Sequence, residues 1–435
     1  MNNIDKPTYV ATVLLLAVFF GIVFHAPLSV FFGQFFDSDI IKAWKEIVLL
    51  VTLPIVIYTV WRAKTHKSVI HDRLLQLMAV YIGLYLLFAL FSHTSEYQKI
   101  AGLMIDLRYI VLFVLVFCLV STVPKLKKVF LKITVVAACM SIGFALLQAT
   151  VLPRDILTHI GYSQETITPY LTVDKNDDYT RINGTLRGPN PLGAYIVILF
   201  SLLTAWVIRN KKTAQKNKWL IAGVAVVLAT VAWATYSRSA LLALVISVSV
   251  LLYMYLKKYE VWTYVAAAII VFATIGSIFL FRSSEFVQNV VLHNNPDGGS
   301  QVDSNDDHAR SIEQGWLRAL DQPYGAGIGS TGSASLKSQQ PIIIENQYLF
   351  VAHETGWFGL GLFAIIYTTI LARLYNCRRD WLSLGLFASG IGLAIIGLFL
   401  PVWSDDTVSM IWFGLAAVAI AAHTKKAVKH GKKTN

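Results

Sequence analysis

The sequence is poor in charged residues, which occupy only 14% of its 435 positions. Hydrophobic residues make up 56% of the chain, and the mean hydropathy is +0.59. A water-soluble globular protein of this length needs far more polar surface, so the composition excludes that class. We therefore expect lipid to be the solvent for most of the chain.

Cysteine is also scarce, with three residues at Cys118, Cys139 and Cys377. All three fall in apolar spans or in loops that we place on the cytoplasmic side, so no disulfide framework is implied. The formal charge is +12. A basic balance indicates a nucleic-acid partner only where the charges share a surface. Here they are spread through separate loops, so we expect no nucleic-acid partner.

Apolar stretches recur along the whole chain. We predict an all-α polytopic integral membrane protein of about 12 transmembrane helices, each about 20 residues long, forming a single membrane domain over residues 1–435. The predicted spans are 8–32, 43–61, 73–92, 102–121, 129–151, 189–209, 218–235, 239–256, 261–281, 347–372, 381–401 and 407–424. The first span is too long for a signal peptide and lacks a small-residue cleavage site, so it should remain as an anchor.

The basic residues follow the positive-inside rule if the N-terminus is cytoplasmic. Most Lys and Arg residues then fall in cytoplasmic segments and most acidic residues on the opposite side, with both termini in the cytoplasm. Two predicted outer loops, 152–188 and 282–346, are too long for simple turns, so we expect function there. The second lies between spans nine and ten, and we expect it to be partly helical and to bind substrate or acceptor.

The second outer loop contains an acidic stretch, HNNPDGGSQVDSNDDH, from His293 to His308. Its Gly, Asn and Ser content predicts a loop. It has neither the spacing of an EF-hand nor a compact cluster of His and Cys. We therefore favour a solvated acidic loop over a metal site, and we predict no metal ligands.

Arginines at the outer ends of the spans are the main candidates for binding an anion. A cation beside hydrocarbon is costly unless it lies in a wet cavity or meets an anion, and guanidinium groups bind phosphate oxygens bidentately. The candidates are Arg181 and Arg187 in RINGTLRGPNPLG, Arg238 in TYSRSALL, Arg310 before EQGWLRAL, and Arg108 in GLMIDLRY. Snorkelling, or pairing with Asp106, Asp306 or Asp307, stays open as the structural alternative. Arg238 has no acid close in sequence, so there we favour binding.

The sequence ENQYLFVAHETGWFGL contains the candidates for a general base. Glu345 and Asn346 lie at the start of the tenth predicted span, and His353 and Glu354 lie about two turns deeper. A carboxylate or a neutral imidazole can accept a proton from an attacking hydroxyl. Glu345 could instead cap the helix, and His353 could form a hydrogen bond between helices, and both alternatives stay open.

Gly327, Gly329 and Gly332 satisfy the pattern G-x-G-x-x-G. That pattern indicates a dinucleotide site only where it follows a strand and opens a helix within a βαβ unit. Neither a preceding strand nor such a unit is predicted here. We expect these glycines to let backbone approach backbone or ligand.

Together these motifs resemble the O-antigen ligase and O-antigen polymerase superfamily of bacterial envelope glycosyltransferases. RINGTLRGPNPLGAY resembles the family's R-x-x-G-T-x-x-x-P-N segment, TYSRSALLAL its S-R motif, and GLMIDLRY its fourth-span segment. The stretch from Arg310 to Trp316 with PYGAGIGS is similar to its R...W...P-x-G-x-G stretch. ENQYLFVAHETGWFGL is similar to its H-N-x-x-L...G-x-x-G-L motif, but this chain has Glu345 where the ligases have histidine.

The resemblance implies a metal-independent inverting glycosyltransferase without a cofactor. Such an enzyme moves a glycan from an undecaprenyl-diphosphate carrier to an acceptor hydroxyl on the outer face of the bacterial cytoplasmic (inner) membrane. Its expected partners are this donor, a glycan, lipid or wall-polymer acceptor, and membrane lipids. The resemblance assigns diphosphate binding to Arg238 and Arg310, with Arg187 or Arg181 as helpers. It implies Glu345 as base with His353 ranked second, supported by Asn346, Gly327 and Gly329.

The alternative from another class is a secondary transporter or flippase of lipid-linked oligosaccharide. Such proteins also have many spans and intramembrane arginines, but they usually contain repeats and broken helices at the midplane. This chain has no convincing similarity between its halves, and its polar residues gather at the outer ends of the spans. We therefore favour the enzyme.

Overall fold

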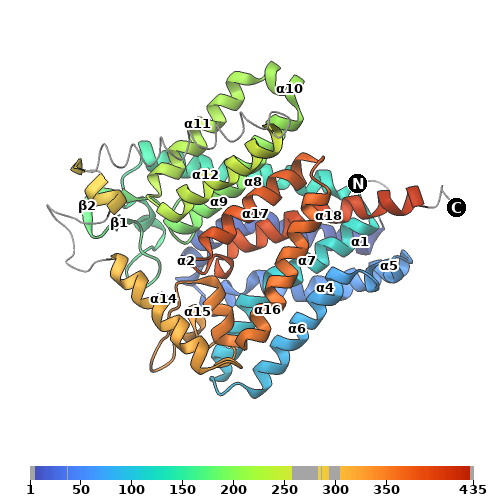
Figure 1. Ribbon diagram of the computed structural model, residues 1–435, viewed down its shortest axis with the longest axis horizontal. Helices are drawn as coiled ribbons and strands as arrows, with labels where there is room; N and C mark the ends of the chain where they lie inside the picture. The colour runs from blue at the N-terminus through green and yellow to red at the C-terminus, as the bar shows by residue number, and fades with distance from the viewer. Residues whose placement is uncertain (1–4, 37, 257–282, 286, 293–303, 432–435) are drawn as a thin grey trace. The chain divides into compact units, whose positions relative to one another are not determined.

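The computed structural model describes residues 5–36, 38–256, 283–285, 287–292 and 304–431 (Figure 1). These residues are predominantly helical, which confirms the predicted all-α class. The longer helices are α1 (Lys6–Gly21), α2 (His25–Gly33), α4 (Trp44–Arg62), α6 (Arg73–Phe91), α7 (Glu96–Thr122), α8 (Leu126–Thr150), α9 (Pro189–Arg209), α11 (Lys218–Ala234), α12 (Arg238–Leu256), α14 (Ser304–Asp321), α16 (Gln347–Asn376), α17 (Trp381–Ile396) and α18 (Asp406–Gly431). The short elements are η1 (Ile22–Phe24), α3 (Ser38–Lys42), α5 (His66–Ile70), η2 (Ile156–Ile160), β1 (Leu171–Val173), β2 (Asn176–Arg181), α10 (Lys211–Lys216), η4 (Val287–Leu292), α15 (Gly332–Ser335) and η5 (Val402–Ser404).

Within the described ranges, nine helical segments are long and apolar enough to cross a membrane. Each coincides with a predicted span. The spans predicted at 218–235 and 381–401 correspond to the shorter apolar helices α11 and α17. The span predicted at 261–281 lies outside the described residues.

The chain divides into two compact units. The first comprises Met1–Met140, Ser311–Arg378 and Gly397–Asn435, and the second comprises Ser141–Arg310 and Arg379–Ile396. Each unit is assembled from segments far apart in the sequence.

The core of the first unit is built on α7 and α18, which pack along each other (Figure 1). Both helices are predominantly buried, in contrast to the more exposed α6 and α8. In this core, Trp403, Trp412, Phe413 and Tyr367 form a cluster of rings with centroids 5.0–6.5 Å apart. These aromatic contacts fix α18 against α16.

A buried ionic network crosses the same core. Arg108 of α7 forms ion pairs with Asp406 of α18 and with Glu46 of α4, and Lys45 lies 2.9 Å from Asp406 and 3.2 Å from Glu46. His25 Nδ1 accepts a hydrogen bond from Trp44 Nε1 at 3.0 Å, which leaves Nε2–H to donate to Asp406 at 2.9 Å. Two cations thus face two carboxylates, so the network is close to neutral. Arg108, considered as an anion-binding candidate, is a structural residue whose partners come from other helices rather than from Asp106.

The second unit is held by close contact between α9, α12 and α17 (Figure 1). Glycines of α17 lie where its backbone contacts those of α9 and α12. A Cβ on Gly385 would lie 2.9 Å from Leu202 Cα, and a Cβ on Gly392 would lie 2.8 Å from Ala243 O. Close packing of backbones is what holds helices together when lipid surrounds them. α9 is thereby fixed beside α12, which begins at Arg238.

Two local features differ from the predictions. Residues 171–181 form an antiparallel hairpin whose turn places Asp174 and Lys175 at φ values of 46° and 62°. The stretch 293–308 was predicted to be a loop, but its last residues, Ser304–His308, begin α14. Acidic residues favour the first turn of a helix, so a composition typical of loops also suits a helix start. The rest of that stretch, including His293, lies outside the described residues.

We expect Arg108→Leu to destabilise the protein by about 3–5 kcal/mol, because it leaves Asp406 and Glu46 buried without their cation. The exposed pair Arg62–Asp5, with side chains 56% and 34% exposed, supplies the control. Arg62→Leu should cost at most about 1 kcal/mol. Thermal unfolding of both variants in the same detergent measures the difference, and equal shifts would contradict a structural role for the network.

Candidate functional site

The predicted site residues fall into both units. Arg181, Arg187, Arg238 and Arg310 belong to the second unit, and Glu345, Asn346, His353, Gly327 and Gly329 belong to the first. Arg187, Arg238 and Arg310 are exposed, whereas Arg181 and Glu345 are half-buried.

Arg181 is held in place by hydrogen bonds from its guanidinium. It ends β2, where its Nε donates to Thr235 O at 2.9 Å and its Nη2 donates to Asn190 Oδ1 at 2.7 Å. The next residue, Ile182, donates its N–H to Ala234 O at 3.2 Å. These bonds fix the end of the hairpin to the turn between α11 and α12, which carries Arg238.

Arg181 and Arg238 act on each other as like charges. Burial, and then the Arg238 cation, lower the pKa of Arg181 to about 10, and Asp174 offsets part of this shift. Arg181 therefore stays charged at neutral pH. Two neighbouring guanidinium groups favour a ligand with more than one negative charge.

The turn that presents Arg238 is tight and strained. Tyr236 has φ of 46°, a conformation that is rare for a bulky residue. Its N–H bonds Trp233 O at 2.9 Å, and Ser237 N–H bonds Thr235 Oγ1 at 3.2 Å. The Tyr236 ring stacks edge-on against Tyr179 of β2, with centroids 6.1 Å apart. Strain held by such bonds is typical of a functional position, where it fixes one side-chain direction.

Glu345 ends an extended segment that leads into α16. Its N–H donates to Ser311 Oγ at 3.1 Å, so the backbone of Glu345 is tied to α14. Asn346 is the N-cap: its Oδ1 accepts from Tyr348 N–H and Leu349 N–H, and its Nδ2 donates to Leu398 O at 2.9 Å. The capping role thus falls to Asn346.

His353 is fully buried, and neither ring nitrogen has a hydrogen-bond partner within the described chain. The neighbouring Glu354 is also buried and lies close to the buried Asp106 of α7, and its Oε1 accepts a hydrogen bond from Gly329 N–H at 3.0 Å. Because His353 and Glu354 are buried, neither side chain is accessible to an acceptor molecule that arrives from solvent. Glu345 is only half-buried, so it is the more suitable base.

α16 is broken at Gly356, which has φ of 67°. A loop seals the break: Ala326 N–H donates to His353 O at 2.6 Å, Gly327 N–H to Glu354 O at 3.2 Å, and Trp357 N–H to Pro323 O at 3.1 Å. Backbone groups inside a membrane need internal partners, and the loop supplies them. This break was not predicted, although a glycine inside an apolar span was a local signal for it.

The same loop packs against the start of α7. Gly327 and Gly329 have φ of 103° and 75°, and a Cβ on Gly102 would lie 2.6 Å from Gly329 N. Gly329 also donates its N–H to Glu354 Oε1 at 3.0 Å. The glycines therefore bring backbone against backbone, as predicted, and the G-x-G-x-x-G pattern belongs to a loop between helices.

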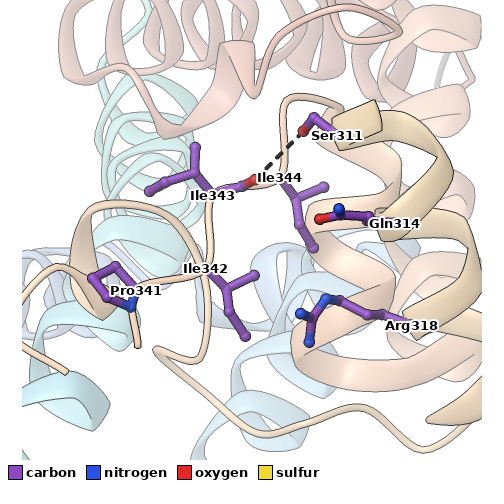
Figure 2. A pocket seen from close by; sticks show the side chains of 8 residues that line it. Ser311, Gln314, Arg318, Pro341, Ile342, Ile343 and Ile344 are labelled. Atoms are coloured by element: carbon purple, nitrogen blue, oxygen red, sulfur yellow. Dashed lines mark hydrogen bonds between the residues drawn. The ribbon is translucent and has the colours of Figure 1, made fainter. Parts of the chain in front are cut away.

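The sequence analysis did not identify Arg318 as a candidate functional residue. A pocket of about 100 Å³ lies between α14 and residues 341–344, next to Glu345, and Arg318 lines it (Figure 2). The available signal was helical spacing, because Gln314 and Arg318 lie four residues apart on α14. Among the described residues, no group of three or more His, Cys, Asp or Glu side chains is arranged to hold a metal.

Residues 223–364 match the family model described as O-Antigen ligase. The predicted resemblance to the O-antigen ligase superfamily is confirmed. The matched segment begins in α11 and ends in α16, so it includes Arg238, Arg310, Glu345 and His353. No curated protein matches the chain.

The family match and the apolar helices together indicate a multi-pass membrane protein of the O-antigen ligase and polymerase type, an enzyme of glycan transfer. This family implies a lipid-linked glycan and an acceptor as partners in general terms. The S-R motif, the stretch from Arg310 to Trp316 with PYGAGIGS, and ENQYLFVAHETGWFGL lie in the matched segment, whereas RINGTLRGPNPLGAY and GLMIDLRY lie outside it.

We expect Gly329→Ala to destabilise the loop that seals α16. The alanine would be strained at φ of 75°, which costs about 1–2 kcal/mol, and its Cβ would collide with the backbone of Gln98. Gly361 of α16 is the control, since nothing lies within 4 Å of a Cβ there. Gly361→Ala should leave thermal unfolding and transfer activity near wild type. Similar behaviour of the two variants would refute the packing role of Gly329.

Proposed function

We propose that this protein is a metal-independent inverting glycosyltransferase. It moves a glycan from an undecaprenyl-diphosphate carrier to an acceptor hydroxyl on the outer face of the bacterial cytoplasmic membrane. The observation that carries the proposal is the pair Arg181 and Arg238. Arg238 follows the strained α11–α12 turn inside the O-antigen ligase match, and Arg181, at the end of β2, donates a hydrogen bond to Thr235 of that turn. The basic-residue distribution, with cytoplasmic termini, supports the orientation.

The arginines are assigned to the donor. When the bond between the sugar carbon and the phosphate oxygen breaks, the electron pair leaves with the diphosphate, and guanidinium groups stabilise that developing charge. Arg238 and Arg310 are the main groups, with Arg187 and Arg181 as helpers. Because arginine keeps its charge, the leaving group needs no added proton.

Glu345 is assigned to the acceptor. Its carboxylate accepts the proton of the attacking hydroxyl while the new glycosidic bond forms. A single displacement inverts the configuration at the sugar carbon. The half-buried position of Glu345, against full burial of His353, supports this choice.

We expect Arg238→Ala and Arg310→Ala each to lower the transfer rate by about 10²–10³-fold, the effect of losing a group that stabilises transition-state charge. Arg209→Ala, in the second unit at the far end of α9, should keep wild-type activity. The assay uses purified protein in liposomes, an undecaprenyl-diphosphate-linked glycan, candidate acceptors and EDTA. A wild-type protein that moves the lipid-linked glycan between leaflets without transfer would establish the flippase instead.

We expect Glu345→Gln to lower the transfer rate by about 10²–10⁴-fold, the typical contribution of a general base. His353→Leu keeps a similar volume at the buried position and should reduce activity far less. Single-turnover rates with saturating donor compare the two variants. A larger loss in His353→Leu, with normal thermal unfolding, would exchange the two roles.

A further inference from the structure

The pocket beside Glu345 has one polar wall and one apolar wall (Figure 2). α14 supplies Ser311, Gln314 and Arg318, and the extended segment 341–344 supplies proline and isoleucine side chains. Gln314 and Arg318 both extend from α14 toward that segment in Figure 2. A sugar presents hydroxyl edges and an apolar face, which such walls can contact together.

The apolar wall is rigid. Ile344 is 2% exposed and packs in a buried cluster with Ala319, Leu349 and Ala352. A Cβ on Gly315 would lie 3.2 Å from Ile344 Cγ2, so α14 and the segment are already in close contact there. The pocket is therefore fixed by packing on both sides.

Arg318 is half-buried, and within the described residues its guanidinium takes part in no ion pair or side-chain hydrogen bond. Its electrostatic neighbour is His353, which is not an acid. The network around Arg108, in the same unit, shows the contrasting case of a cation fully matched by carboxylates. A guanidinium beside isoleucines, with no acid paired to it, favours an anion brought by a ligand.

The lining and the position of the pocket limit that ligand. Arg318 is the one charged side chain among the lining residues, so the pocket suits one anionic substituent of a larger molecule. Ser311 Oγ accepts from Glu345 N–H at 3.1 Å and donates to Ile343 O at 3.4 Å, so the rim of the pocket is fixed to Glu345.

We infer that this pocket binds an anionic substituent, a carboxylate or a phosphate, of the acceptor glycan, with Arg318 as its main ligand. Gln314 and Ser311 supply further polar contacts, and the isoleucines contact the sugar face. The inference rests on the proposed function, because it places the acceptor beside Glu345. Arg318 is a specificity residue and takes no part in the bond changes.

Equilibrium binding tests the pocket without turnover. The purified full-length protein in detergent is titrated with methyl glucuronide, glucose 6-phosphate and methyl glucoside, three probes that differ mainly in charge. We expect one or both anionic probes to bind at least about tenfold more tightly than methyl glucoside, and Arg318→Gln to remove that preference. The probe that is preferred identifies the source of the anion.

Arg378→Gln is the matched control, because it removes the same charge in the same unit at the far end of α16. It should keep the preference for the anionic probe, and unchanged thermal unfolding of Arg318→Gln confirms that the variant is folded. Equal binding of all three probes, or an equal loss in both variants, would overturn the inference. Because binding is read without transfer, these outcomes are distinct from a failure of Arg238→Ala or Glu345→Gln to affect catalysis.

Discussion

Every polar group placed inside hydrocarbon needs a partner from within the protein, and this constraint explains how the first unit is built. Lys45 and Arg108 are buried, and each meets carboxylates from another helix. The break in α16 leaves backbone N–H and C=O groups without partners inside the helix, and residues 323–327 form hydrogen bonds with them. In both places the partner comes from a distant part of the sequence, so satisfying the polar groups also joins α4, α7, α16 and α18.

The loop that seals α16 connects this constraint to function. It is held from three sides: by the broken helix, by Gly102 of α7, and by Glu354, which lies close to Asp106. Just beyond it the chain runs through 341–344 into Glu345 and the Asn346 cap. Glu345 is thus carried by a rigid helix start, whereas its side chain stays half-buried and within reach of solvent. Rigid support beneath an accessible carboxylate is what a general base requires.

The sequence predicted correctly those features that depend on neighbouring residues alone. Hydropathy located the spans because burial in lipid acts on every residue of a helix, and the motifs around Arg238 and Glu345 lie within the family match. It failed where a long-range partner decides the outcome. Nothing near Arg108 in sequence indicates Asp406, and nothing around Asp174 and Lys175 required a hairpin rather than an irregular loop. At the break in α16, Gly356 itself was a local signal, but nothing near it in sequence indicates that residues 323–327 supply the hydrogen bonds that seal the break.

Arginine shows why residue type alone does not reveal a role in this protein. Arg108 lies in an apolar helix, a position that suggested a ligand, yet two carboxylates of the chain satisfy it. Arg318 lies in an amphipathic helix, where a charged residue is usually exposed to solvent and has no special role. Here, however, Arg318 lines a pocket, and among the described residues it forms no ion pair with an acid. Arg181 stands between these cases, since its hydrogen bonds are satisfied by Thr235 and Asn190 while its charge is opposed by Arg238. The charge balance around each guanidinium, rather than its depth in the membrane, separates the arginines that hold the fold from those suited to an anionic ligand.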